Sequence, residues 1–381
     1  MKILILSPVP LLAENDCGIS KILFNYILTS SDLYFHIYSP EIETDVQIKN
    51  FPNATFSFYK KNIQPLRNTL RGQARSQFSR STINQLLSSL NNVGKTFDVI
   101  HFFSYSFIPA LSKIDYELRS RCTISLIDSH PLFFERRAKK ELNPFKRFLF
   151  YFEARKYLSL EKQIPQEFKI HFVSKVDSDH FKAVHGNDFQ KVTPIENGVR
   201  LDHFFPTEDS SSGTPCEHIL FFGNLEYSPN KDALHFICQE LGPHLQAEHK
   251  NLSLLIAGRS SHPIQCGNNI SVMGYVDDLN QLLNQSKLII FPLFFGTGIK
   301  NKVLEALSTG APIISTSVGL EGIPLSKLPT GYPLKVINER DPKVWASEIE
   351  KVIATKCGPR TAYRPFSWEL FAKKMRQLYL S

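Results

Sequence analysis

The stretch KLIIFPLFFGTGIKNKVLEALSTG, residues 287–310, has the pattern of a strand, a glycine turn and a helix. Residues 287–293 are a short, continuous apolar run, typical of a strand buried on both faces. If the helix starts at residue 299, its core-facing stripe consists of Ile299, Val303, Ala306, Leu307 and Gly310. A buried strand followed by such a helix is the repeating unit of a parallel α/β sheet.

Similar apolar runs recur along the chain, bounded by turn residues and separated by stretches long enough for helices. In the first half they are residues 2–6, 33–39, 97–103, 122–128, 169–174 and 191–198. In the second half they are residues 218–223, 252–258, 269–274, 287–293, 311–316 and 332–338. Because these runs are continuous rather than alternating, they indicate parallel strands covered by helices. The sequence therefore predicts an α/β protein with two doubly wound parallel sheets.

The length of 381 residues predicts two domains. The stretch RLDHFFPTEDSSSGTPCEH, residues 200–218, is rich in Ser, Pro, Gly and Thr and is interpreted as a linker. We therefore expect an N-terminal domain at 1–199, a linker at 200–217, a second domain at 218–360 and a closing segment at 361–381. That segment contains an amphipathic helix whose apolar residues are Trp368, Phe371, Met375 and Leu378, and we expect it to pack on a core.

The composition is that of a globular protein, with 42% hydrophobic and 21% charged residues. The formal charge of +8 favours anionic partners such as nucleotides, nucleic acid or acidic membranes. Six cysteines at 17, 122, 216, 238, 266 and 357 include no CxxC pair, so we expect reduced thiols in a cytosolic chain. The opening run is too short for a signal peptide, and no stretch is long and apolar enough to span a membrane. A soluble or peripheral protein is expected.

Two basic stretches stand out. Residues 67–80 contain no acid, and residues 134–162 mix Arg and Lys with aromatic residues. A solvated helical face is the first interpretation of both, and a surface that contacts anionic lipid or a polyanion is the alternative. No nucleic-acid-binding motif accompanies them, so nucleic acid is not an expected partner.

The glycine turn of the opening stretch is suited to phosphate. Gly296 and Gly298 let backbone amides approach a ligand, and the N-terminus of the following helix adds partial positive charge. Lys300, expected in the first helical turn, would oppose the helix dipole unless an anion is present. Glu305 is expected to point away from the core stripe, on the same face as Gly298, where a carboxylate could bind sugar hydroxyls. A surface glutamate paired with Lys302 is the alternative.

Other candidates are weaker. Gly18 precedes an apolar-periodic helix and marks a second turn, at the first strand. Asp128 and His130 follow a strand end, where open α/β sheets place ligand-binding groups, although a loop histidine is the simpler interpretation. The D-x-D of Asp177 and Asp179 is interpreted as helix capping, so no metal is expected.

Taken in order, these segments resemble the retaining glycosyltransferases of family 4, also called group 1, which have the GT-B fold. The resemblance covers nearly the whole chain and rests on several segments, which are HFVSKVDSDHF (171–181), PIENGVRLDHFFP (194–206), ILFFGNLEYSPNKDALHF (219–236), LLIAGR (254–259), NISVMGYVDDLNQLLNQSKLIIFPL (269–293) and GTGIKNKVLEALSTGAPIISTSVGLEGI (296–323). The last of these is the most specific, and as a set they are strong. The resemblance implies two Rossmann-like domains that face each other across a cleft.

The resemblance also implies roles for residues. Glu305 would bind the nucleotide ribose, and the turn Gly296-Thr297-Gly298 with Lys300 would face the diphosphate and the donor sugar. Gly223, Asn224, Lys231 and Arg259 would complete the nucleotide-binding set, with Tyr275 and Val276 beside the base. Gly18 would approach the diphosphate from the N-terminal domain, and His130 would lie beside the reacting sugar. The catalytic set is then Lys300, Glu305 and His130.

Two departures from the commoner family pattern concern the donor. Thr297 stands where many members have a second glutamate, and Asn224 stands where many have an arginine. Lys231 could serve as the family's nearby lysine, although its spacing is stretched. The sequence resembles a branch with G-[ST]-G-x-K-x-K-x-x-E and Y-x-P-N motifs. The departures affect the expected donor sugar more than the expected activity.

The implied function is transfer of a sugar from a nucleoside-diphosphate sugar to a glycan or glycolipid acceptor, with retention of anomeric configuration. Synthesis of cell-surface polysaccharide or lipopolysaccharide, at the inner face of the membrane, is the expected setting. No metal or other cofactor is expected, and the closing helix should cross back onto the N-terminal domain. The alternatives are a non-catalytic GT-B subunit that binds a nucleotide or glycan and anchors a partner enzyme, and a sugar-nucleotide epimerase of the same fold.

Overall fold

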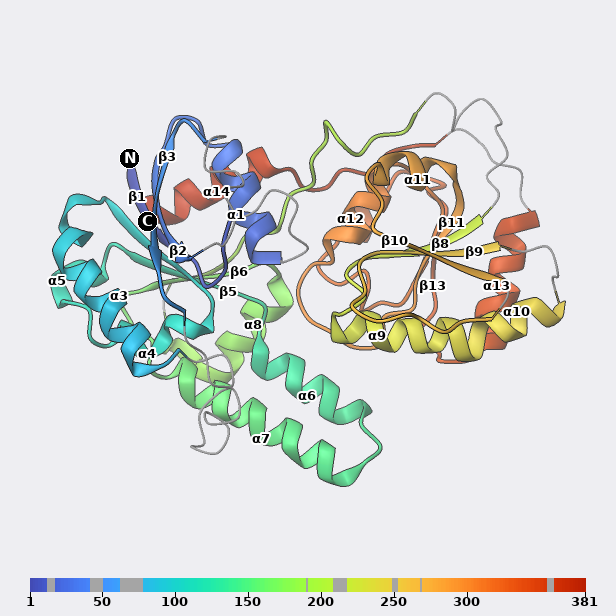
Figure 1. Cartoon of the computed structure of the whole chain (residues 1–381), viewed down its shortest axis with the longest axis horizontal. Helices are drawn as coiled ribbons and strands as arrows, with labels where there is room; N and C mark the ends of the chain where they lie inside the picture. Colours follow the sequence, from blue (N-terminus) through green and yellow to red (C-terminus); the bar gives the residue numbers. More distant parts are fainter. Residues whose placement is uncertain are drawn as a thin grey trace. The chain divides into compact units, whose positions relative to one another are not determined.

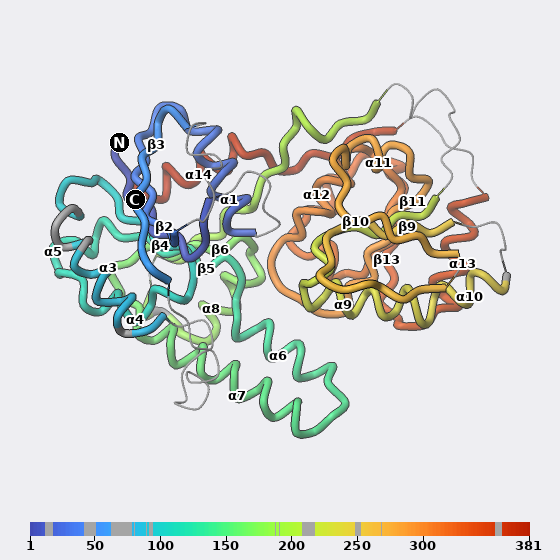
Figure 2. Tube along the Cα trace, in the orientation of Figure 1, coloured from blue at the N-terminus to red at the C-terminus, as the bar shows by residue number. Residues whose placement is uncertain are grey.

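The computed structural model describes residues 1–11, 18–41, 51–61, 78–189, 191–207, 218–248, 253–267, 269–354 and 360–381. The chain forms two compact units. Unit 1 consists of Met1–Asn197 together with Trp368–Ser381, and unit 2 is Gly198–Ser367. Figure 2 shows this discontinuity as colour, since the red C-terminal helix lies among the blue N-terminal elements. Of the linker expected at 200–217, residues 208–217 lie outside the described part of the chain.

Unit 1 is built on a seven-stranded sheet with the order β3-β2-β1-β4-β5-β6-β7. All of its strand pairs are parallel. The strands are β1 (Lys2–Leu6), β2 (Tyr34–Pro40), β3 (Ala54–Tyr59), β4 (Val99–Phe103), β5 (Cys122–Ile127), β6 (Lys169–Phe172) and β7 (Val192–Pro194). The helices are α1 (Gly18–Leu28), α3 (Arg80–Val93), α4 (Ile108–Leu111), α5 (Tyr116–Arg119), α6 (His130–Lys140), α7 (Pro144–Glu161), α8 (Lys175–His185) and α14 (Trp368–Leu380).

Helices cover both faces of this sheet. Ile3 and Ile5 of β1 belong to a buried cluster with α1 and α14, whereas Leu4 and Leu6 belong to the cluster on the α3 side. Successive side chains of a strand point to opposite faces, so a continuous apolar run fills both cores. The helices α6 and α7 form a hairpin that extends from the sheet (Figure 1).

A chain of buried hydrogen bonds fixes α14 to the sheet. His171 Nε2 lies 2.9 Å from the Ile195 carbonyl, so it donates and leaves Nδ1 to accept from Ser125 Oγ at 2.7 Å. Ser125 in turn accepts from His101 Nε2 at 2.7 Å, and His101 Nδ1 accepts from the Tyr379 hydroxyl at 2.6 Å. In each histidine one ring nitrogen donates and the other accepts, so both rings are neutral and each has a defined tautomer.

Unit 2 is built on a six-stranded parallel sheet with the order β10-β9-β8-β11-β12-β13. The strands are β8 (His218–Phe222), β9 (Ser253–Ala257), β10 (Ile270–Gly274), β11 (Ser286–Phe291), β12 (Ile313–Ser315) and β13 (Leu334–Val336). The helical segments are α9 (Ser228–His235), the π-helical turn Phe236–Leu241, α10 (Gly242–Glu248), α11 (Leu279–Gln285), α12 (Asn301–Ser308) and α13 (Pro342–Ala354). The predicted fold class, two parallel sheets flanked by helices, is confirmed.

Three expectations need correction. No strand was expected between residues 39 and 97, yet this part of the chain contributes the edge strand β3 and the helix α3. The helix after the glycine turn begins at Asn301 rather than at residue 299. Cys238 and Cys266 form a disulfide, so the expectation of reduced thiols is wrong for this pair, which the fold brings together across 28 residues. Cys122 is a buried free thiol.

Among the described residues, no helix is both long and apolar enough to cross a lipid bilayer. Residues 67–77 of the first basic stretch lie outside the described part of the chain. The second basic stretch, residues 134–162, forms most of the α6–α7 hairpin.

Candidate functional site

The candidate site of unit 2 lies where the strand order reverses. From β8 the chain adds β9 and β10 on one side of the sheet and then returns to add β11 to β13 on the other. In open α/β sheets ligands bind at this reversal, beyond the carboxyl ends of the strands. Here those ends are followed by Gly223 after β8 and by the turn 294–300 after β11.

Gly223 and Gly258 hold the ends of β8 and β9 close together. Their φ angles are +136° and +145°, a region that side-chain-bearing residues rarely adopt. A Cβ at Gly258 would lie 1.9 Å from the Gly223 carbonyl oxygen, so only glycine fits there. A Cβ at Gly223 would press on Lys302 Cδ at 3.1 Å and Asn230 Nδ2 at 3.2 Å. Gly223 thus keeps the space beside Lys302 open.

The turn Gly296-Thr297-Gly298 connects β11 to α12. Both glycines have positive φ, +140° and +70°, whereas Thr297 is buried. Lys300 is the N-cap residue of α12 rather than part of its first turn, and its ammonium group lies 2.7 Å from the Gly298 carbonyl and 3.1 Å from that of Thr297. The cation therefore lies over the turn, at the positive end of the helix dipole.

Lys302, in the first turn of α12, is the cation that the sequence interpretation missed. Its ammonium group donates to Asn230 Oδ1 at 2.8 Å and lies 4.4 Å from the ring centre of Phe221. No carboxylate of the described residues forms an ion pair with it. Burial, and secondly the nearby Lys300, lower the pKa of Lys302 to about 7. The charge of Glu305 partly opposes this shift. A partly buried ammonium that forms no ion pair is costly, and an anionic ligand would relieve that cost.

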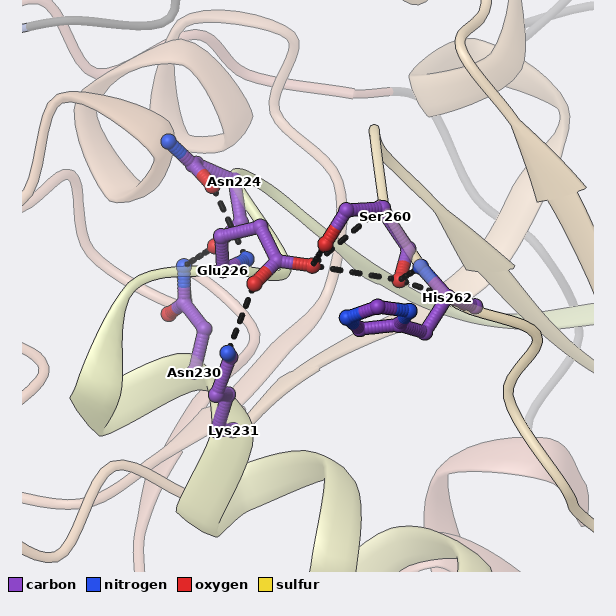
Figure 3. Close-up of polar contacts among 7 residues, drawn as sticks. Asn224, Glu226, Asn230, Lys231, Ser260 and His262 are labelled. Carbon is purple, nitrogen blue, oxygen red and sulfur yellow. Dashed lines mark hydrogen bonds and ion pairs between the residues drawn. The ribbon is translucent and has the colours of Figure 1, made fainter.

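The loop after β8 uses its polar groups internally (Figure 3). Asn224 Oδ1 accepts the backbone N–H of Glu226 at 2.9 Å, and the Asn224 carbonyl accepts from Asn230 at 2.6 Å. The carboxylate of Glu226 pairs with Lys231 at 2.6 Å and accepts the backbone N–H of Ser261 at 2.9 Å. The hydrogen bond from Lys231, followed by those from Ser261, lowers the pKa of Glu226 to about 2.

The expected nucleotide-binding roles of Asn224 and Lys231 stay predictions. Asn224 shapes the loop through its amide oxygen, and Lys231 is paired with Glu226. Glu226 itself was not a predicted site residue, because a glutamate three positions after a strand carries no distinctive signal. It ties the loop after β8 to the loop after β9 (Figure 3).

The candidate base-binding residues follow β9 and β10. The guanidinium of Arg259 lies 4.3 Å from the ring centre of Tyr275, a cation–π contact. Tyr275 is about half exposed, and Arg259 is exposed as well. Val276 packs partly buried against the core of unit 2. Arg259 and Tyr275 thus form a flat, exposed platform.

Glu305 lies on α12 and is only 5% exposed. It was expected to point away from the core, yet residues 303–308 are all buried, because α12 is covered on more than its sheet-facing side. Glu305 is therefore not a surface residue, although its charge does act on Lys302, whose pKa it raises. Glu305 lies one helical turn after Lys302 on α12, where its carboxylate could accept hydrogen bonds from a ligand.

In unit 1, His130 is the first residue of α6 and lies in an aromatic cage. Its ring stacks on Tyr105 at 4.4 Å and meets Tyr157 edge-on at 4.7 Å. Nδ1 is buried and has no hydrogen-bond partner among the described residues. Burial lowers the pKa of His130 to about 4, so the ring is neutral at pH 7.

The backbone before His130 is strained. Ile127, at the end of β5, has φ +70°, which is unfavourable for a β-branched residue. Asp177, at the start of α8, holds the following loop by accepting the backbone N–H of Ser129 at 2.8 Å. Such strain persists where surrounding contacts fix it, often at functional sites. No sequence pattern indicated it.

The remaining predicted residues give weaker evidence for a functional site. Gly18 begins α1 at an exposed position, and the turn before it, residues 12–17, lies outside the described residues. In the D-x-D, the Asp177 carboxylate accepts hydrogen bonds from Ser129 and Ser174, and Asp179 forms an ion pair with Lys175. Within the described ranges, no three His, Cys, Asp or Glu side chains come together in a way that could hold a metal ion.

Comparison with known proteins finds a family match in the second unit. Residues 216–355 match the model of a family described as "Glycosyl transferases group 1". A curated relative, an uncharacterised 44.6 kDa protein in the cps region of Klebsiella pneumoniae, is 27% identical over 191 residues. That match covers 47% of this chain and 47% of the relative, so it spans about half of each protein.

Solved structures resemble the whole chain. Sucrose-phosphate synthase from Thermosynechococcus elongatus has a TM-score of 0.70 at 15% identity, and the match covers 100% of this chain and 98% of that one. HepE from Anabaena, solved in complex with UDP and glucose, has a TM-score of 0.68 at 11% identity, with 100% of both chains covered. The chain thus has the two-sheet GT-B fold, and its second unit matches the group 1 glycosyltransferase family.

Proposed function

We propose that this protein transfers a sugar from a nucleoside-diphosphate sugar to a glycan or glycolipid acceptor, with retention of anomeric configuration. The observation that carries the proposal is the position of Lys302. Within the segment that matches the family, a partly buried ammonium that forms no ion pair among the described residues lies beside Gly223 and in the first turn of α12, at the reversal point of the sheet. A diphosphate is the kind of ligand that such a site favours.

The chemistry follows from where charge develops. When the bond between the anomeric carbon and the diphosphate oxygen breaks, that oxygen gains negative charge. The N-terminus of α12, Lys300 and Lys302 would stabilise this charge without rearranging. Retention requires the acceptor hydroxyl to attack from the face that the diphosphate leaves, so a departing phosphate oxygen would take the acceptor proton. Glu305 would bind the ribose, and neutral His130 would hydrogen-bond to a sugar hydroxyl.

A branch with these two lysines has less need of a metal ion. In many sugar-nucleotide enzymes a divalent cation neutralises the leaving diphosphate, and here Lys300 and Lys302 would supply two positive charges at that place. We therefore expect transfer to continue in EDTA. A rate that falls in EDTA and returns with Mg²⁺ or Mn²⁺ would contradict this expectation.

The donor sugar is proposed to depend on Thr297. In the commoner family pattern a glutamate at this position contacts the donor sugar, whereas the Thr297 side chain is shorter and uncharged. The space and hydrogen-bonding pattern around the sugar therefore differ. A setting in cell-surface polysaccharide synthesis is supported by the relative in the cps region of Klebsiella pneumoniae.

A donor screen tests the proposal. The purified protein is incubated with a panel of UDP-, GDP-, ADP- and TDP-sugars, with and without lipid vesicles, and free nucleoside diphosphate is measured. We expect release from one donor or a few related donors, and loss of that release in Lys300→Ala. Absence of release from every donor, together with tight binding of a nucleotide, would favour a non-catalytic subunit, which Asn224 and Thr297 make the second candidate. Appearance of an epimerised free sugar would favour an epimerase.

A further inference from the structure

The α6–α7 hairpin presents an apolar stripe to solvent. Phe145, Phe148, Leu149 and Phe152 of α7 are 69%, 64%, 37% and 44% exposed. Their spacing of three and four residues places them on one face of the helix, and Phe148 and Phe152 lie parallel, with ring centres 6.4 Å apart. Leu142, in the turn of the hairpin, is 95% exposed. We call these five residues the hairpin stripe.

The hairpin stripe does not contribute to the core of unit 1. The buried residues of α7 all lie in its second half, from Glu153 onward, and include Ala154, Tyr157 and Leu160. The two helices of the hairpin are joined by other contacts, among them Arg137 over the ring of Phe150 at 4.4 Å. Exposing contiguous aromatic surface is unfavourable, so a patch of this kind marks an interaction site.

The charge around the hairpin stripe is strongly positive. Residues 136–156 contain eight basic and two acidic residues, a net charge of 8 − 2 = +6. Lys139, Lys140, Lys146, Arg147 and Arg155 are exposed. One of the two acids, Glu153, is buried and neutralised by Lys156 at 3.1 Å. An exposed aromatic stripe bordered by lysine and arginine is the composition of helices that lie in a membrane interface.

We propose that the hairpin stripe docks on a bilayer that contains anionic lipid, with the aromatic rings at the level of the headgroups and the basic residues on the phosphates. A second copy of the chain fits this surface poorly, because two faces that each carry a net charge of +6 repel one another. A soluble acidic partner would need no row of exposed phenylalanines. Apolar burial and attraction to anionic lipid would act together, since neither alone gives stable docking.

Vesicle sedimentation tests this proposal. The full chain is mixed with vesicles of phosphatidylcholine alone or with about a third phosphatidylglycerol, as the anionic lipid. We expect binding to the anionic vesicles and weak binding to the neutral ones. The variant Phe145→Ser, Phe148→Ser, Phe152→Ser should lose about tenfold or more in affinity, and so should Lys139→Gln, Lys140→Gln, Lys146→Gln, Arg147→Gln.

The matched control is Tyr116→Ser, Val184→Ser, Leu380→Ser, which removes three apolar side chains of unit 1 that are 72%, 42% and 74% exposed. It should bind like the unchanged protein, and circular dichroism should show the same folded state for all variants. No binding to anionic vesicles, an equal loss in the control, or an unaffected stripe variant would overturn the proposal. A lipid-free dimer that the stripe variant abolishes would assign the surface to self-association instead. Vesicle binding is measured without any donor sugar. Failure of the membrane proposal can therefore be distinguished from failure of the proposed function in the donor screen.

Discussion

The ammonium group of Lys302 lies 2.8 Å from Asn230 Oδ1, and no carboxylate among the described residues pairs with it. We expect Lys302→Met to weaken nucleoside-diphosphate binding by about 1.5–3 kcal/mol, the value of a hydrogen bond to a charged group. That energy corresponds to a rise in Kd of about 10- to 150-fold. The folded protein should keep about the same stability, because a partly buried ammonium that forms no ion pair is replaced by an apolar side chain of similar length. Calorimetric titration with UDP and thermal unfolding measure the two effects.

Lys231→Met is the matched control for this change. Lys231 has the same charge and lies in the same unit, but it is exposed and bound to Glu226. Its loss should change the Kd only slightly. If Lys231→Met weakens binding as much as Lys302→Met does, the cation of this site is Lys231 and the assignment of Lys302 is wrong.

Diphosphate binding should be accompanied by proton uptake above pH 7. Because the pKa of free Lys302 is about 7, the side chain is largely neutral at pH 8, and a bound diphosphate would raise that pKa and draw in a proton. At pH 6 the side chain is already charged, so uptake should be small. Titrations in buffers of different ionisation enthalpy measure the uptake, which should be close to zero in Lys302→Met. Equal uptake in both proteins would point to another group.

Glu305→Gln should raise the KM for the nucleotide sugar. The buried carboxylate accepts hydrogen bonds from two ribose hydroxyls in the proposed complex, and an amide accepts them less strongly. We expect a rise of about tenfold, from the same energy range for charged hydrogen bonds. A deoxyribose donor should bind the two proteins with more similar affinity. Identical donor titrations for both proteins would remove the ribose assignment.

Unit 1 should lose stability as the pH falls from about 6.5 to 4. Burial lowers the pKa of His130 and His171 to about 4, and that of His101 well below its usual value, so these rings are neutral in the fold. The unfolded chain takes up protons at a pKa of about 6.5, so their stabilisation is complete above that pH and is lost on acidification. Because one pKa unit corresponds to about 1.4 kcal/mol, the expected cost is about 3 kcal/mol for each of His130 and His171. Urea denaturation across this range measures it.

His171→Gln should flatten the pH profile of stability while lowering stability at neutral pH, because the hydrogen bonds to Ile195 and Ser125 are lost. A profile as steep as that of the unchanged protein would show that other groups cause the acid sensitivity.

Reduction of the Cys238–Cys266 disulfide should destabilise unit 2. The bond closes a loop between residues 28 positions apart, and such cross-links contribute about 2–4 kcal/mol. Denaturation with and without dithiothreitol should show a difference of this size, and Cys238→Ser should remove the difference. Peptide mapping without reductant checks the pairing directly, and recovery of both cysteines as free thiols would contradict it.

The sequence predicted the sheets well because buried parallel strands have a simple signature. Continuous apolar runs marked β1, β4, β8 and β11, and the glycine turn marked the site. The edge strand β3 was missed because its residues, ATFSFY, alternate polar and apolar and are mostly not buried. An edge strand has one neighbour and less need of a continuous apolar run.

The candidate site was predicted in part, and the errors have one cause. A helical projection gives the angle of a side chain but not what covers it, so Glu305 was placed on an open face although other elements bury it. The same limit hid Lys302, whose significance comes from Asn230 of another helix and from the absence of a pairing carboxylate in the described residues. The pairing of Lys231 with Glu226 could not be predicted either, because it depends on loop geometry.

The division of unit 1 into Met1–Asn197 and Trp368–Ser381 has a consequence for synthesis on the ribosome. Unit 2 is one continuous stretch of chain, so it can fold as soon as residue 367 has emerged from the ribosome. Unit 1 lacks α14 until residues 368–381 follow, so Ile3, Ile5 and the buried face of α1 remain open to chaperones during that interval. The first half of the chain to be translated is therefore the last to be finished.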